Sequence, residues 1–175
     1  NDVIALAQTG TGKTAAYGIP VLQKVNPEEK HTQALILSPT RELCLQIADD
    51  LADFSKYVPG LHVVPVYGGA SIEMQIRQLR KGAQIIVATP GRLIDLMKRG
   101  VAQLDAVNNV VLDEADEMLN MGFTESINAI FEGVPTNRNT LLFSATMSRE
   151  IEKIAKSYLN NYKEIVVGSR NEGAE

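Results

Sequence analysis

The chain has 175 residues, of which 45% are hydrophobic and 22% charged, and this composition predicts one globular domain with a substantial core. Its 17 Lys and Arg residues against 21 Asp and Glu residues give a net charge of -4, which argues against binding nucleic acid by diffuse charge alone. The single cysteine, Cys44, excludes an internal disulfide and a cysteine-based metal site, which favours a reducing, cytoplasmic location.

Apolar, β-branched runs recur at near-regular intervals and predict strands that are buried on both faces. These runs are residues 2–7, 34–38, 62–67, 83–88, 109–113, 140–144 and 164–168. Between them, apolar residues repeat every three or four positions, as expected of helices that cover a sheet. The alternation predicts an α/β fold with a mostly parallel sheet of about seven strands and helices on both faces. Ligands bind such sheets at the carboxyl ends of the strands.

Several of the expected helix starts carry a hydroxyl-bearing residue that can serve as an N-cap. These residues are Thr40, Ser71, Thr89, Thr124 and Ser148. Pro90 follows Thr89 at the first helical position, and Gly82 and Gly100 fit helix terminators. Pro20 falls inside the helix expected after the first strand, where it predicts a kink or an early end because proline lacks the backbone N–H.

The first expected strand is followed by the glycine-rich stretch QTGTGKT, residues 8–14. A turn of this kind before a helix can point backbone N–H groups at a phosphate, while Lys13 adds a cation and Thr14 can place its hydroxyl on Mg²⁺. The pattern matches G-x-x-x-x-G-K-[ST] except that Ala7 stands where the first glycine is expected. We therefore predict a phosphate-binding loop that consists of Ala7, Gln8, Thr9, Gly10, Thr11, Gly12, Lys13 and Thr14.

A dinucleotide-binding oxidoreductase is the alternative interpretation of this loop. Gly10, Gly12 and Ala15 also satisfy G-x-G-x-x-[GA], but that fingerprint requires an acidic residue about 20 positions later, at the end of the second strand. The second expected strand ends instead in SPTR, residues 38–41, and Glu28-Glu29 precede it. The oxidoreductase interpretation is therefore strongly disfavoured.

The strand expected at residues 109–113 ends in a cluster of carboxylates, with Asp113, Glu114 and Asp116 within four residues. Acidic side chains repel one another, so a cluster at this position indicates that the carboxylates bind a cation or take part in catalysis. Beside a phosphate loop, Asp113 can hold Mg²⁺, and Glu114 can orient and deprotonate the water that attacks a γ-phosphate. Without such a loop, a solvated acidic patch at a helix N-terminus would be the better interpretation.

The motifs AQTGTGKT, PTREL, GG, TPGR, DEAD and SAT occur in this order, each at an expected strand end, and span residues 7–146. With this ordered set, the chain resembles the first RecA-like lobe of the DEAD-box ATP-dependent RNA helicases. The resemblance implies a RecA-like P-loop lobe over residues 1–168 and the start of an interdomain linker at residues 169–175. It also implies ATP and Mg²⁺ as cofactors and RNA as a partner.

The resemblance assigns a role to each matching residue near the nucleotide. Lys13, Asp113 and Glu114 would be catalytic: Lys13 grips the triphosphate, Asp113 and Thr14 hold Mg²⁺, and Glu114 activates water. Asp116 would communicate with Ser144, Ala145 and Thr146, the segment that couples the nucleotide state to strand separation.

Three further strand ends carry residues that suit the sugar-phosphate backbone of RNA. Free N–H groups at helix starts, glycines that permit close approach and two arginines provide the required chemistry. The residues that match the family's RNA-contacting segments are Pro39, Thr40, Arg41, Gly68, Gly69, Thr89, Pro90, Gly91 and Arg92. Such contacts predict an affinity that falls with salt and varies little with sequence. For any one segment taken alone, ordinary helix capping is an equally good interpretation.

We expect the chain to be a fragment, because the family's upstream glutamine-containing segment and second RecA-like lobe are absent from it. The second lobe would complete the RNA channel and supply an arginine for phosphoryl transfer. Weak nucleotide binding and negligible RNA-stimulated hydrolysis are therefore expected of this chain alone. Two hypotheses stay open for the parent protein: an ATP-driven RNA-unwinding enzyme, or an ATP-gated RNA clamp or scaffold. No stretch approaches the roughly 18 apolar residues needed to cross a bilayer.

Overall fold

The computed structural model describes residues 2–8 and 13–167 of the protein. Four residues of the expected phosphate loop, Thr9, Gly10, Thr11 and Gly12, lie outside the described residues, as does the expected linker start at residues 169–175.

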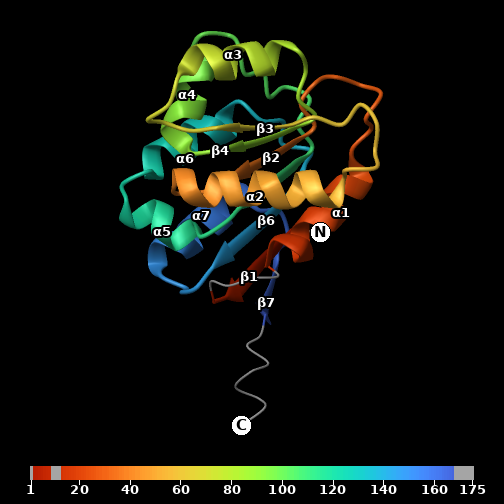
Figure 1. Ribbon diagram of the computed structural model, residues 1–175. Coiled ribbons are helices and arrows are strands. Elements are labelled where there is room, and N and C mark those ends of the chain that lie inside the picture. The colour runs from red at the N-terminus through yellow and green to blue at the C-terminus, as the bar shows by residue number, and fades with distance from the viewer. Residues whose placement is uncertain (1, 9–12, 168–175) are drawn as a thin grey trace.

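Strands and helices alternate through the described part of the chain (Figure 1). The strands are β1 (Val3–Ala7), β2 (Ala34–Leu37), β3 (Val63–Val66), β4 (Ile85–Ala88), β5 (Asn109–Leu112), β6 (Asn139–Ser144) and β7 (Lys163–Val167). The helices are α1 (Lys13–Lys24), α2 (Arg41–Phe54), α3 (Ile72–Arg80), α4 (Pro90–Lys98), α5 (Ala115–Asn120), α6 (Thr124–Glu132) and α7 (Arg149–Tyr158). Each expected strand is present within one or two residues of its predicted bounds.

The seven strands form one sheet in the order β3-β4-β2-β5-β6-β1-β7, and every neighbouring pair is parallel. The predicted α/β fold with a parallel sheet is confirmed. Figure 1 shows β3 and β7 at opposite edges of the sheet. The order divides the sheet into a half with β2, β3 and β4 and a half with β1, β5, β6 and β7.

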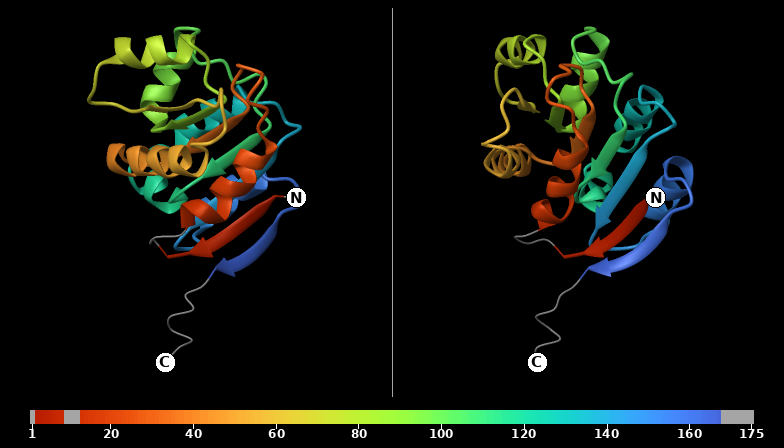
Figure 2. Two further views of the ribbon diagram at one scale, coloured as in Figure 1. Left: turned by 45° about the vertical axis from the view of Figure 1, so that its right-hand side comes forward. Right: turned by 90° about the vertical axis from the view of Figure 1, so that its right-hand side faces the viewer.

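The sheet is buried on both faces because successive side chains point to opposite sides of each strand. Ile36 on β2 packs in a cluster with Val21 of α1 and Ile47 of α2. Its neighbour Leu35 packs in a second cluster with Leu93 of α4 and other residues of the opposite face. Figure 2 shows α1 and α2 on one side of the sheet and α4, α6 and α7 on the other. This burial explains the continuous apolar runs of the sequence.

Most of the predicted helix starts are confirmed. Thr40, Ser71, Thr89 and Ser148 occupy N-cap positions. The prediction for Thr124 is wrong by one residue, because Phe123 holds the N-cap position. A tight turn through Gly122, whose φ is 86°, joins α5 directly to Phe123 and so moves the helix start.

Pro20 does not end α1, which continues to Lys24, so the early end expected there is wrong. Ala16, whose carbonyl would accept the missing hydrogen bond, is exposed to water, which can satisfy it. Among the helices of the described residues, none is long and apolar enough to cross a membrane.

Candidate nucleotide and RNA site

The strand order brings the end of the predicted phosphate loop and the predicted acidic cluster to neighbouring places at the carboxyl ends of the strands. Lys13 begins α1 just after β1, and Asp113 follows β5 directly. β6 lies between β1 and β5, so the residues that follow β6 also reach this place. Segments that are 100 residues apart in the sequence therefore meet.

Lys13 and Asp113 form an ion pair at the centre of this arrangement. The Lys13 Nζ lies 2.6 Å from the Asp113 Oδ1, and the Asp113 side chain is completely buried. A buried carboxylate without a partner would be strongly destabilising, because it loses its hydration. The positive charge of Lys13 therefore stabilises the buried, negatively charged carboxylate of Asp113.

Tyr17 provides the second partner of Asp113, and sequence reasoning missed it. The Tyr17 hydroxyl donates a hydrogen bond to the Asp113 Oδ2 at 2.8 Å, and the tyrosine is fully buried. Burial, followed by the negative charge of Asp113, raises the pKa of Tyr17 far above its ordinary value. The hydroxyl therefore remains a hydrogen-bond donor at physiological pH. A tyrosine on the inner face of a helix looks like an ordinary core residue, so the sequence carried no signal for this contact.

Glu114 has a left-handed backbone, with φ 54° and ψ 53°, at the N-cap position of α5. Partial burial, the largest effect, raises the pKa of its carboxyl; Asp113, Asp116 and Glu117 raise it further, and Lys13 lowers it. A general base works best when its pKa approaches the pH at which it operates. The surroundings of Glu114 thus suit proton acceptance better than those of a solvated glutamate.

The predicted coupling residues also lie together. The Thr146 Oγ1 donates to the Asp116 Oδ2 at 3.4 Å, which joins the segment after β6 to the acidic cluster. The buried Ser144 donates its hydroxyl hydrogen to the Thr146 carbonyl oxygen at 2.7 Å and so fixes the turn. Ala145 is exposed between them. A change at the acidic cluster can therefore reach the end of β6 through one hydrogen bond.

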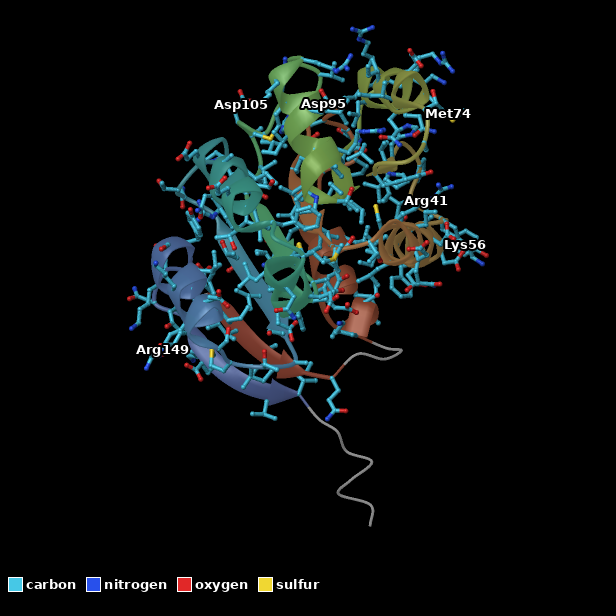
Figure 3. The ribbon with its side chains drawn as sticks, turned by 90° about the vertical axis from the view of Figure 1, so that its left-hand side faces the viewer. Arg41, Lys56, Met74, Asp95, Asp105 and Arg149 are labelled. Atoms are coloured by element: carbon cyan, nitrogen blue, oxygen red, sulfur yellow. The ribbon has the colours of Figure 1, made fainter. Side chains whose placement is uncertain are left out.

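Arg41 is the first residue of α2, just after the carboxyl end of β2, and Figure 3 shows it beside that helix. Its Nη1 donates to the Gly69 carbonyl oxygen at 3.4 Å, and its guanidinium lies 5.2 Å from the centre of the Tyr67 ring. The preceding residue, Thr40, accepts a hydrogen bond from the Leu43 backbone N–H at 3.1 Å. The segments after β2 and β3 are thus joined.

Gln75 on α3 joins the segments after β3 and β4, and sequence reasoning did not identify it either. Its Oε1 accepts hydrogen bonds from the Arg92 Nη1 at 3.0 Å and from the Tyr67 N–H at 3.3 Å. Its Nε2 donates to the Tyr67 carbonyl oxygen at 3.1 Å, and the Arg92 Nη2 donates to the Ala70 carbonyl oxygen at 3.2 Å. One buried amide therefore holds a strand end and an arginine of the predicted RNA site in place.

A protein-family model described as DEAD/DEAH box helicase matches residues 1–154. The chain belongs to this helicase family. It is 51% identical over 168 residues to a protein of Buchnera aphidicola named ATP-dependent RNA helicase DeaD, and 55% identical over 159 residues to DEAD-box ATP-dependent RNA helicase CshA of Geobacillus kaustophilus. These alignments cover 96% and 91% of this chain but only 28% and 34% of those helicases. The chain therefore spans about a third or less of their length.

Solved structures of DEAD box proteins share the fold. The crystal structure of a DEAD box protein from Methanococcus jannaschii matches with a TM-score of 0.90 and 43% identity, over 97% of this chain and 46% of that chain. A structure of an ATP-dependent RNA helicase from Sulfolobus tokodaii, described as hypothetical, matches with a TM-score of 0.86 and the same identity. The predicted RecA-like helicase fold is confirmed.

The oxygen atoms of the helicase motifs suit Mg²⁺, which prefers hard oxygen ligands. Thr14 lies in the first turn of α1, and Asp113 and Glu114 directly follow β5. No group of three or more His, Cys, Asp or Glu residues that could hold a metal occurs in residues 2–8 and 13–167. The Thr14 hydroxyl and the Asp113 carboxylate nevertheless fit Mg²⁺, which is commonly held by one or two carboxylates together with substrate phosphates.

The remaining residues of the predicted RNA site in this helicase lobe lie at the same carboxyl edge. Pro39 and Thr89 are buried, and Pro90 occupies the first helical position of α4. A Cβ atom built at Gly68 or Gly91 would meet no other atom within 4 Å. Packing against the described residues therefore does not require glycine at these two positions, whereas the close approach of a ligand backbone would.

Proposed function

We propose that the protein is the N-terminal, ATP-binding lobe of an RNA helicase that couples ATP hydrolysis to local unwinding of RNA duplexes. The contact between Lys13 and Asp113 carries the proposal, because it joins the phosphate-loop lysine to the acid that would hold Mg²⁺. The DeaD and CshA relatives, both named ATP-dependent RNA helicases, support the same activity.

In the proposed mechanism, the residues of the phosphate loop bind the triphosphate, and Lys13 exchanges Asp113 for the outer phosphates. Thr14 and Asp113 would hold Mg²⁺, which neutralises negative charge on the phosphate oxygens when it is bound. Glu114 orients the attacking water and accepts its proton. Asp116 and Thr146 pass the change at the nucleotide to the end of β6 through their hydrogen bond.

The half of the sheet with β2, β3 and β4 is proposed to hold the RNA backbone. Thr40 and Thr89 mark helix starts whose N–H groups suit a phosphate, and Arg41 and Arg92 add positive charge. These groups contact phosphate and sugar, so they grip RNA with little sequence specificity. A second RecA-like lobe of the same parent chain is the proposed partner that completes the channel, and the cytoplasm is the proposed location.

Duplex separation by the full-length protein tests this proposal. Glu114→Gln removes the base but retains the size of the side chain, so we expect multiple-turnover unwinding to fall at least about 100-fold while nucleotide binding remains. Glu125→Gln is the matched control, because Glu125 is exposed on α6 and is not among the charges that shift the pKa of Glu114, so it should have little effect. If Glu114→Gln unwinds RNA like the wild type, hydrolysis does not drive remodelling and the protein is an ATP-gated clamp instead.

A further inference from the structure

The buried tyrosine of α1 has a chemical role that its packing does not require. We propose that Tyr17 is a positioning residue, whose hydroxyl holds the Oδ2 of Asp113 so that the Oδ1 faces the site of the magnesium nucleotide. This inference rests on the proposed function, because it assigns a task to Tyr17 in the binding of the same ligand.

The two partners of Asp113 differ in their freedom to move. Lys13 ends in a flexible side chain that is 10% exposed, and its charge can be drawn from the Oδ1 towards phosphates. Tyr17 is fully buried, its ring lies 5.3 Å from that of Phe143 on β6, and it belongs to the core cluster with Val21 and Ile47. The hydroxyl of Tyr17 therefore stays on the Oδ2 when Lys13 leaves.

The presence of a hydroxyl at this position needs an explanation. Burying a hydroxyl in an apolar cluster is unfavourable unless it is hydrogen-bonded, and a phenylalanine would fill the same space without that cost. The Tyr17 hydroxyl donates its hydrogen to Asp113 at 2.8 Å, and the side chain of Thr14 is a second hydrogen-bonding neighbour. Since bonds to a charged acceptor are the stronger ones, the contact with Asp113 accounts for tyrosine at the position.

The hydrogen bond from Tyr17 matters most when Lys13 has left Asp113 and binds the nucleotide. Asp113 is then a buried carboxylate that retains one fixed donor on its Oδ2, while its Oδ1 is available to the cation or to a water bound to it. Without the Tyr17 hydroxyl, the carboxylate can rotate and share both oxygens among the remaining partners. Tyr17 thus acts on magnesium binding through the orientation of Asp113.

The experiment compares the affinity of the full-length protein for fluorescent N-methylanthraniloyl-ADP in magnesium chloride and in EDTA. Tyr17→Phe removes only the hydroxyl, so we expect about tenfold weaker binding in magnesium and less than about a twofold change in EDTA. Tyr158→Phe is the matched control, because it removes a tyrosine hydroxyl that bonds Asn128. This control should leave both affinities unchanged. On an Asp113→Asn background, Tyr17→Phe should cause no further loss, since its effect passes through Asp113.

Each other outcome overturns the inference. Equal losses in magnesium and in EDTA, or a Tyr17→Phe protein that does not fold, would mean that the hydroxyl only supports the core. Unchanged binding in magnesium, or a full additional loss on the Asp113→Asn background, would mean that Tyr17 does not act through Asp113. A wild-type protein that binds the nucleotide equally with and without magnesium, or not at all, would overturn the proposed function together with the inference.

Discussion

At Glu114, burial and three neighbouring carboxylates raise the pKa of the side chain, against the attraction of Lys13. The folded state therefore binds a proton at this residue more readily than the unfolded state, for which the ordinary value of 4.5 applies. As the pH rises from 4.5 through the raised pKa of the folded protein, Glu114 becomes charged and lowers the free energy of unfolding. The charged form of this residue thus costs stability at neutral pH.

Glu114→Gln should consequently raise the melting temperature at neutral pH, because the amide avoids burying a charge. The gain should disappear below pH 4.5, where the wild-type residue is protonated in both states. Thermal unfolding of the wild type and the variant at several pH values measures this difference. The exposed Glu125 offers the control substitution Glu125→Gln, which should change the melting temperature little at any pH. A gain for Glu114→Gln that grows on acidification would contradict the explanation.

Some contacts of the candidate site could be predicted from the sequence, and others could not. Lys13 and Asp113 could be predicted to meet because both follow strands that end at the same edge of a parallel sheet. Tyr17 and Gln75 could not, because their helical spacing is that of core and surface residues, and their hydrogen bonds join distant segments. A buried tyrosine or glutamine indicates a role in the site only when the residue that it hydrogen-bonds is known.

Among the helices, α2 and α7 begin in the same way, although only α2 borders the predicted RNA site. The hydroxyls of Thr40 and Ser148 accept hydrogen bonds from the backbone N–H groups of Leu43 and Ile151 at 3.1 and 3.2 Å. Thr40→Ala and Ser148→Ala should each lower the free energy of unfolding by about 1 kcal/mol, since an N-cap bond is lost.

The two substitutions should differ in their effect on RNA. We expect Thr40→Ala to weaken RNA binding by the full-length protein about three- to tenfold, because the start of α2 then holds a phosphate less well. Ser148→Ala should leave the RNA affinity unchanged at equal loss of stability. Fluorescence anisotropy with a single-stranded RNA measures the affinity, and equal losses for both variants would remove α2 from the RNA site.

The elements themselves were largely predictable. All seven strands could be identified because strands buried on both faces are continuous apolar runs, and β2, β4 and β5 are buried at every position. The order of the strands could not be predicted, because an apolar run carries no information about which neighbour it pairs with. The N-cap of α6 was predicted one residue too late, at Thr124, because the turn through Gly122 places Phe123 at that position and Phe123 has no capping side chain.

At the scale of the whole molecule, the two proposed sites share one sheet of the described residues, with the β2–β5 pair as the boundary between them. An arginine near the transferred phosphate accelerates phosphoryl transfer by about 10³ to 10⁵. In the described part of the chain, Arg41 and Arg92 bond to the segment after β3, on the half of the sheet proposed to hold RNA. A second lobe is therefore expected to supply the arginine that acts on the nucleotide.

The 175-residue chain alone should accordingly bind nucleotide weakly and show less than about 1% of the RNA-stimulated ATPase rate of the full-length protein. Steady-state ATPase measurements with and without RNA on both proteins test this expectation. The full-length protein with Glu114→Gln provides the background rate. Full RNA-dependent turnover by the short chain would show that no second lobe is needed.

The position of β1 in the sheet has a consequence for biosynthesis. Of the seven described strands, β1 leaves the ribosome first, yet in the described sheet it pairs with β6 and β7, which begin at Asn139 and Lys163. Contacts between such distant parts of a chain form late, because a long loop must close before they stabilise anything. During translation, β1 must therefore wait unpaired while β2, β3 and β4 can already assemble.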